Sequence, residues 1–185
     1  PYTLAHYLAK HRFSPVPEDE PAVKEALASV DEHLSALMAV QGTRSVDSFH
    51  RDLGMTMLDK CGMSRSNEGL AQAKAHIREL RDAFWKDVRI PGRRDAINPE
   101  LEKAARVADF LELAELMVDD AADRNESCGG HFREDHQTPE GEALRDDEHH
   151  AYSAAWEYQG SGEPATLHKE PLTFEFVRLS QRSYK

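Results

Sequence analysis

The chain has 185 residues, 39% of them hydrophobic, and a formal net charge of -11 at pH 7. This length suits one domain, or one small domain with an appendage. The acidic balance argues against nucleic acid as a partner, because phosphates require a basic patch, and no apolar run approaches the roughly 20 residues that span a bilayer.

The N-terminal segment, residues 1–13, starts inside a helical pattern. Leu4, Tyr7 and Leu8 recur at spacings of three and four residues, which predicts an apolar helix face that packs on a partner surface. The chain opens on Pro1 with no methionine before it, and we expect it to be a fragment of a longer protein. Two closely spaced prolines just beyond this segment stop the helix.

Three helical patterns follow, each with a start or stop signal. Acidic residues before Pro21 favour the positive end of the first helix, and Gly42 ends it. Ser45 suits the N-cap of the second helix, and Ser66 or Asn67 that of the third. The third pattern alternates steps of three and four, which is typical of a seam for antiparallel packing. The apolar positions are Val23, Leu27, Val30, Leu34 and Leu37, then Val46, Phe49, Leu53 and Met57, then Leu70, Ala73, Ile77, Leu80, Phe84 and Val88.

A fourth helix has the clearest start, with Asn98 as N-cap and Pro99 at the first helical position. Its apolar residues fall on two faces, which predicts that it touches two neighbours and lies centrally in the domain. Short connections make neighbouring helices antiparallel. The two faces are Leu101, Ala104, Ala108, Leu111 and Val118 on one side, and Phe110, Leu113 and Met117 on the other.

The composition and the residue pattern of the sequence change after these helices. Residues 133–149 are charged and contain proline and glycine, which predicts a loop. Alternation of apolar and polar residues predicts a strand around Tyr152–Glu157, and two more short strands at Thr166–Lys169 and Leu172–Val177. Gly160 and Gly162 mark a turn between them. The residues therefore indicate a helical domain with a β-patterned tail.

The stretch 125–135 joins the helical part to the tail and reads Asn-Glu-Ser-Cys-Gly-Gly-His-Phe-Arg-Glu-Asp. Its adjacent glycines, Gly129 and Gly130, let the backbone turn sharply or approach another surface closely. We call residues 125–135 the corner. The part of it from Cys128 to Arg133 and the N-terminal apolar stripe are the two surfaces that we expect to dock against something absent from the chain.

The sequence contains no complete nucleotide or metal site. A nucleotide-binding loop needs more glycines than the pair at Gly160 and Gly162, which the flanking strands mark as a hairpin turn. Four of the ten histidines lie near Cys128, but the adjacent His149 and His150 would point to opposite faces of a strand. We interpret these histidines as solvated or hydrogen-bonded side chains rather than as metal ligands.

A nucleophilic centre is also disfavoured. Ser127 and Cys128 lie close to His131, but the strand-turn-helix setting of a nucleophile elbow is missing. A buried or interface thiol is the better interpretation of Cys128. With only one other cysteine, Cys61, the chain fits a reducing compartment with free thiols, and a disulfide between the two remains an alternative. Adjacent acids such as Asp119 and Asp120 diverge on a helix and are expected to be solvated.

Several stretches together resemble one family. The corner is similar to the Glu-Ser-Arg-Gly-Ala-His-x-Arg motif of succinate dehydrogenase and fumarate reductase flavoprotein subunits. Residues 144–148 resemble the Arg-Asp-Asp element that follows this motif, and the segment from Arg182 to Tyr184 resembles the family's Arg-x-Tyr ending. Residues 45–54 and 111–117 lie where the family's helices carry similar sequences. The likeness covers nearly the whole chain.

Two departures from the motif refine the resemblance. Cys128 stands where many members have arginine, and Gly130 where they have alanine. In this form, the chain looks most like the menaquinone-linked bacterial branch of the family. Any role of that arginine is not carried over, although Arg133 can retain a neighbouring one.

The resemblance implies a fold. It is mainly α, an antiparallel three-helix bundle similar to a spectrin repeat, with an extra N-terminal helix and a C-terminal tail of short β-strands. Residues 1–13 are expected to be the residual end of the upstream FAD-domain helix. Residues 14–125 would form the helical bundle domain, and residues 126–185 the loop and short-strand tail.

The resemblance assigns no catalytic, cofactor-binding or metal residue to this chain, because those of the family lie upstream. FAD is expected in the full-length protein and not in this fragment, which is expected to be inactive alone. Arg133 would pair with a carboxylate or carbonyl on the FAD-domain surface. The motif residues that carry over form an expected interface: Ser127, Cys128, Gly129, Gly130, His131, Arg133, Arg182 and Tyr184.

The implied function is that of the C-terminal helical domain of a flavoprotein subunit that interconverts succinate and fumarate. The domain would stabilise its own FAD-binding domain and contact the iron–sulfur subunit, which passes electrons to menaquinone through a membrane cytochrome b anchor. This places it on the cytoplasmic face of the bacterial inner membrane. Two alternatives stay open: a free-standing helical interaction module, and the equivalent domain of L-aspartate oxidase or adenylylsulfate reductase.

Overall fold

The computed structural model describes residues 2–12, 14–160 and 162–180. The chain divides into two units, residues 1–36 and 37–185. The first unit holds helix α1 (Tyr2–Lys10) and most of helix α2 (Pro21–Val40). Neither the apolar stripe of α1 nor the middle of α2 is buried among the described residues; only the last part of α2 is, at Leu37.

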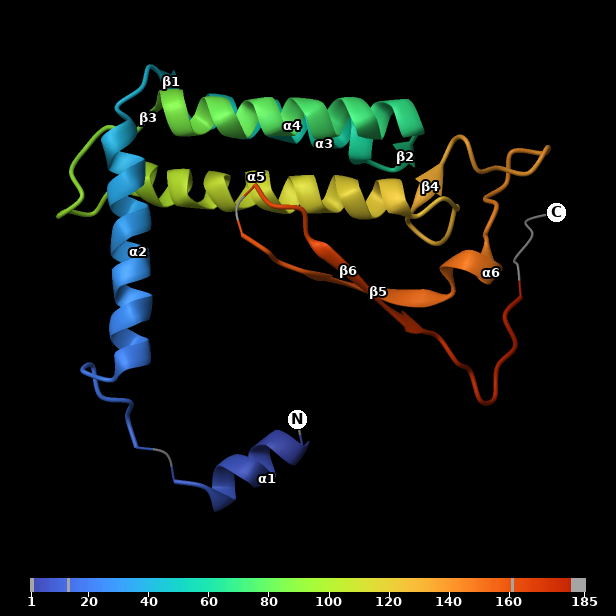
Figure 1. The fold of residues 1–185 in the computed structure, drawn as a ribbon, viewed down its shortest axis with the longest axis horizontal. Helices are drawn as coiled ribbons and strands as arrows, with labels where there is room; N and C mark the ends of the chain where they lie inside the picture. The colour runs from blue at the N-terminus through green and yellow to red at the C-terminus, as the bar shows by residue number, and fades with distance from the viewer. Residues whose placement is uncertain (1, 13, 161, 181–185) are drawn as a thin grey trace. The chain divides into compact units, whose positions relative to one another are not determined.

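The second unit is built on three helices, α3 (Val46–Cys61), α4 (Asn67–Asp87) and α5 (Pro99–Asp123), which pack against one another lengthwise (Figure 1). Short connections reverse the chain between them, as the sequence predicts. The mainly α architecture with an antiparallel three-helix bundle is confirmed. No described helix is long and apolar enough to cross a membrane.

The predicted helix starts are confirmed by their hydrogen bonds. The hydroxyl of Ser45 accepts from the backbone N–H of Ser48 at the start of α3, and the hydroxyl of Ser66 accepts from that of Gly69 at the start of α4. The Asn98 side chain accepts from two backbone N–H groups of the first turn of α5. These caps satisfy donors that have no partner within the helix.

Most of the bundle core comes from the apolar seams read from the sequence, with Val107, Ala114 and Ala121 of α5 in addition. All six seam residues of the third pattern and all five on the first face of α5 are buried. The rings of Phe49 and Phe84 pack in a T-shaped, edge-to-face arrangement with their centroids 5.3 Å apart, and this contact joins α3 to α4. An aromatic pair in this geometry adds to the energy of area burial.

The second apolar face of α5 is not buried. Phe110, Leu113 and Met117 are 40%, 53% and 47% exposed. The helix does contact two neighbours, α3 and α4, as its two apolar faces predict, but these three side chains stay uncovered in the described part of the chain. Only two helices pack on α5, and a three-helix arrangement leaves its remaining face free.

The link between α2 and α3 lies against the end of α4. Strand β1 (Arg44–Ser45) pairs in parallel with β3 (Val88–Arg89). Gly42 donates its N–H to the carbonyl of Val88 at 2.9 Å, and a Cβ placed on it would lie 2.0 Å from the carbonyl carbon of Asp87. The positive φ at the end of α2 belongs to Gln41, at 48°. Gly42 is thus needed for close approach rather than for a left-handed turn.

The tail begins with short elements that hold it to the bundle. Strand β2 (Ser64–Arg65), between α3 and α4, pairs in parallel with β4 (Phe132–Arg133). A short helix, α6 (Asp147–His150), follows. Residues 134–146 lie outside any named helix or strand, as the predicted loop requires. The placement of His149 and His150 on a strand is wrong, because Asp146 caps a helical turn there with its carboxylate.

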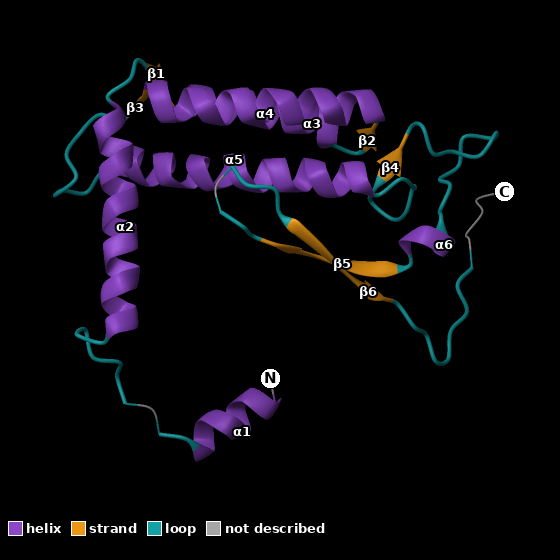
Figure 2. Cartoon of the chain, in the orientation of Figure 1, coloured by secondary structure: helices purple, strands orange, loops and turns teal. Residues whose placement is uncertain are grey.

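A hairpin follows α6 in the tail (Figure 2). Strand β5 (Tyr152–Glu157) pairs antiparallel with β6 (Thr166–Pro171). The Trp156 indole N–H donates to Asp120 on α5 at 2.7 Å. Asp119 pairs with Lys74 of α4, so the expectation that these two acids are merely solvated is wrong. The hydrogen bond from Trp156 links strand β5 to α5. The hairpin is thereby anchored to the bundle.

The predicted strand at Leu172–Val177 does not form. The β6 strand extends two residues beyond Lys169 and ends at Pro171, and the next residues lie outside any strand. Proline has no N–H to donate and ends a ladder readily. Phe174 and Phe176 are 49% and 90% exposed, so the alternating pattern finds no buried side in the described chain.

Candidate functional site

The corner is a tight turn. Cys128 and His131 exchange two backbone hydrogen bonds, of 2.8 and 3.0 Å, and enclose the two glycines. Gly129 has φ of 60°, a left-handed conformation that glycine adopts without strain. A Cβ on Gly130 would meet no described atom within 4 Å. Within the described chain, the sharp turn therefore explains the glycine at position 129 but does not require one at position 130. The thiol-bearing residue Cys128 is exposed, and both cysteines are free.

Ser127 holds the base of the turn. It is fully buried; its hydroxyl accepts from the N–H of Arg133 at 2.8 Å and donates to the carbonyl of the same residue at 3.2 Å. Its own N–H donates to the carbonyl of Leu144 at 2.8 Å. The hydroxyl is thus fully engaged in structure and is not poised as a nucleophile.

Arg133 is the buried centre of the corner, with none of its surface exposed. Its guanidinium donates to the carbonyls of Ala121 and Arg124 at the C-terminal end of α5, at 3.0 and 3.2 Å. It also donates to the side-chain oxygen of Asn67 at the start of α4. With the carboxylate of Asp135 it forms a bidentate ion pair. All five N–H groups therefore have a partner.

This placement corrects one expectation. Arg133 does not reach out to a separate domain, because its donors are all used within the chain. Instead, it places a positive charge on the carbonyl end of α5, where the helix dipole favours a cation. It also lowers the pKa of the Asp135 carboxyl by hydrogen bonding to the charged form. Arg133 thus joins α4, α5 and the tail.

His131 lies between two arginines and is half-buried. Its Nδ1 lies 2.7 Å from the Arg65 guanidinium, which can only donate, so Nδ1 accepts. Its Nε2 then carries the proton and donates to the carbonyl of Arg124 at 2.9 Å. Burial lowers the pKa of His131, and the charges of the surrounding arginines lower it further, although the bond to Arg124 opposes this. The imidazole is neutral and structural at neutral pH.

This geometry predicts how stability depends on pH. Because the pKa of His131 is lower in the folded chain than its ordinary 6.5, the unfolded chain binds a proton first as the pH falls. The folded state should therefore lose stability below about pH 6.5, down to the folded pKa. Urea unfolding of the wild type and of His131→Gln at a series of pH values should show the smaller acid loss in the variant.

A second histidine gives the control with the opposite sign. Asp146 raises the pKa of His149 by hydrogen bonding and charge. The stabilisation from His149 is present in acid and is lost as the pH rises through its folded pKa, so His149→Gln should increase the acid loss. Equal pH profiles for wild type and His131→Gln would contradict the role assigned to His131.

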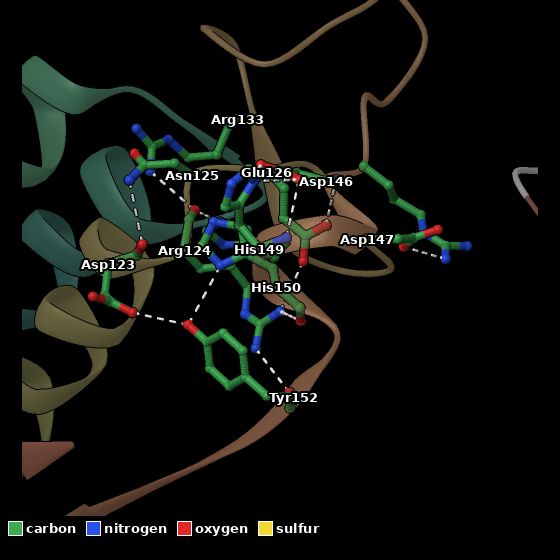
Figure 3. A network of polar contacts seen from close by, with 12 residues as sticks. Asp123, Arg124, Asn125, Glu126, Arg133, Asp146, Asp147, His149, His150 and Tyr152 are labelled. Carbon is green, nitrogen blue, oxygen red and sulfur yellow. Dashed lines mark hydrogen bonds and ion pairs between the residues drawn. The ribbon is translucent and has the colours of Figure 1, made fainter. Parts of the chain in front are cut away.

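A second buried charge pair fastens the corner to the tail, and sequence reasoning missed it. Glu126 is 2% exposed and pairs with Arg124 at 2.7 Å, while its other carboxylate oxygen accepts from the N–H of Asp146 at 2.9 Å. Arg124 also donates to the carbonyls of His150 and Tyr152 (Figure 3). The available signal was an arginine at a helix end followed two residues later by an acid.

The same cluster reaches the hairpin. Tyr152 donates from its hydroxyl to Asp123 at 3.0 Å, and the guanidinium of Arg124 lies over its ring at 5.0 Å. Lys169 of β6 lies over the same ring and pairs with Asp123 at 3.8 Å. The corner, α6 and the hairpin are therefore connected by one polar network, which Figure 3 shows at the end of α5.

The predicted interface residues separate into three groups. Ser127, Arg133 and the side chain of His131 are buried or half-buried and hold the turn, whereas the tip from Cys128 to Gly130 is exposed. The last two predicted residues, Arg182 and Tyr184, lie outside the described residues. Within the described ranges, no group of His, Cys, Asp and Glu side chains is placed to hold a metal ion, and no buried side-chain polar atom lacks a partner.

The chain is similar to known proteins over the bundle, the corner and the hairpin together. The family model described as "Fumarate reductase flavoprotein C-term" matches residues 50–184. A fumarate reductase flavoprotein subunit of a Serratia species is 30% identical over 131 residues, which are 71% of this chain and 21% of that protein. The corresponding subunit of Escherichia coli is 30% identical over 129 residues, 70% of this chain and 21% of that protein.

The fold is also found among solved structures. A quinol-fumarate reductase with menaquinol molecules matches 96% of this chain with a TM-score of 0.74 and 22% identity, over 29% of the matching chain. The 185 residues span about a fifth of the length of the curated relatives that they match.

Proposed function

The chain belongs to the fumarate reductase flavoprotein C-terminal family, and from this we propose that it is the C-terminal helical domain of a flavoprotein subunit that interconverts succinate and fumarate. The observation that carries the proposal is the family match over residues 50–184, which takes in most of α3, all of α4 and α5, the corner and the hairpin in one order. The relatives named above are flavoprotein subunits of fumarate reductase.

The role proposed for the domain is mechanical. The buried charges of the corner are paired inside the described chain, so these side chains are not left over to bind a flavin phosphate or ring. FAD would be bound by residues outside these 185, and no chemical step is assigned to this domain. The exposed tip of the turn, from Cys128 to Gly130, would contact the FAD-binding domain, and the buried Arg133 would hold the turn in place.

The proposed partners follow from the same assignment. Besides its own FAD-binding domain, the domain would contact the iron–sulfur subunit, which receives electrons from FAD. A membrane cytochrome b anchor would be reached only through that subunit, with menaquinone as the electron carrier. The whole complex would lie on the cytoplasmic face of the bacterial inner membrane, with this domain as a peripheral part.

The test compares two proteins purified in parallel. The intact polypeptide that contains these residues should bind FAD, reduce fumarate with a reduced dye and oxidise succinate with an oxidised one. The 185-residue chain alone should be colourless and inactive in both assays. An intact gene product that begins near Pro1 and binds no flavin would contradict the proposal in favour of a free-standing interaction module. Oxidation of L-aspartate instead of succinate would indicate a related flavoenzyme.

A further inference from the structure

An apolar groove between α3 and α5 has no occupant among the described residues. Its volume is about 250 Å³, and besides the polar His50 its lining includes Leu53, Gly54, Met57, Phe110, Leu113 and Met117. A cavity of about 150 Å³ with such a lining holds a benzene-sized group. The groove therefore has room for more than one apolar side chain.

Gly54 is the informative residue of this groove. It lies in the interior of α3, where glycine is the least favourable residue except proline. A Cβ at this position would meet no described atom within 4 Å, and the backbone has no positive φ. Neither packing within the described chain nor backbone geometry requires glycine here. What the glycine does provide is an open floor on which another backbone can lie closely.

The shape of the groove selects the kind of occupant. It runs between two long helices, over residues 50–57 on α3 and 110–117 on α5, or about 12 Å at 1.5 Å per residue. Side-chain ridges of a further helix fit between two such helices. A helix that crosses over Gly54 would cover the exposed side chains of Phe110, Leu113 and Met117 and complete the burial of α5.

Two arguments select the source of that helix. A second copy of this chain carries a net charge of -11 as well, and this repulsion opposes self-association. A contact two helical turns long is also much smaller than the roughly 800 Å² per partner that separate proteins commonly bury. A tethered segment needs less area, because its effective concentration reaches the millimolar range.

We propose that the α3–α5 groove receives an apolar-faced helix from the part of the longer flavoprotein that lies outside these 185 residues, packed over Gly54. This inference rests on the function proposed above. The site on α3 and α5 is distinct from the corner, so the domain is held to the remainder of the polypeptide at a second surface.

The first test uses one substitution in two contexts. In the 185-residue chain, Gly54→Ala should raise the melting temperature by roughly 2–4 °C, since alanine favours the helix and its methyl group meets open space. In the intact flavoprotein, the same change should lower the melting temperature, because the methyl group pushes the docked helix away. The control, Ala75→Gly on the exposed side of α4, should lower it in both proteins. An increase with Gly54→Ala in both would overturn the proposal.

The second test identifies the occupant. A photoreactive phenylalanine analogue at position 110 of the intact protein should cross-link to a helical segment of the same polypeptide outside the 185 residues. A cross-link to the 185 residues themselves, to a second copy or to another subunit would overturn the proposal, as would no cross-link. Flavin content, measured by absorbance in the same samples, separates the two ideas: an intact protein without flavin contradicts the proposed function, whereas a flavin-loaded protein with the wrong cross-link contradicts only the docked helix.

Discussion

Replacing Arg133 with alanine should destabilise the folded chain by about 3–5 kcal/mol, the usual cost of removing one partner of a buried ion pair. The substitution leaves Asp135 without its cation and removes donors from the carbonyls at the end of α5. It also disconnects α4 from the tail, because Asn67 loses its partner. Urea unfolding followed by far-ultraviolet circular dichroism measures the loss.

Two variants sharpen this result. Arg133→Lys keeps the charge but offers a compact ammonium in place of a planar five-donor group, so it should recover only part of the loss. Arg106→Ala is the matched control, because Arg106 is 67% exposed and pairs with Glu102 on the same helix face. An exposed pair of this type contributes about 0–1 kcal/mol. If Arg133→Ala reduced the free energy of unfolding no more than Arg106→Ala, the stabilising role assigned to Arg133 in the corner would be wrong.

Gly42→Ala should destabilise the chain by about 2–3 kcal/mol, at the upper end of the range for overpacked sites. The new methyl group would lie 2.0 Å from the carbonyl carbon of Asp87 and 2.1 Å from its oxygen. Backbone cannot yield as a flexible side chain can, so the β1–β3 pair must separate. The bonds from Thr43 to the Asp87 carboxylate, at 2.7 and 2.8 Å, would be strained with it.

Gly130→Ala is the control for this prediction. Gly130 has open space at its Cβ and no positive φ, so alanine there should change the unfolding free energy by less than about 0.5 kcal/mol. Thermal unfolding of both variants under one set of conditions makes the comparison direct. A Gly42→Ala protein as stable as Gly130→Ala would show that the link before α3 does not need its close approach to α4.

The flanking sequence of each bundle helix was sufficient to predict its position. Caps such as Ser45, Ser66 and Asn98 are local, because a side chain bonds to backbone two or three residues further along. The buried seams are local in the same sense, since their period follows from helix geometry alone. The corner motif likewise indicated the family before any coordinates, and the family model matches the region that contains it.

The tail was predicted less well because an alternating pattern is only one of the two things that a strand needs. Alternation at Leu172–Val177 states which side chains would share a face, but a strand also needs a neighbour to accept its hydrogen bonds. The neighbouring strand β5 is already used by residues up to Pro171. The exposed second face of α5 is a similar case, because apolar spacing reports a preference for burial and not whether a partner is present.

By itself, the sequence determined the helices, the antiparallel bundle and the membership of the family, because each depends on short-range periodicity, capping or ordered motifs. Only the tertiary structure showed which contacts Arg133 and Gly42 make and why they matter. Arg133 has partners from Asn67 to Asp135, and Gly42 is required by Asp87, 45 positions away in the numbering of the chain. Contacts between residues so far apart arise from the packing of whole helices, and no local pattern in the sequence encodes them.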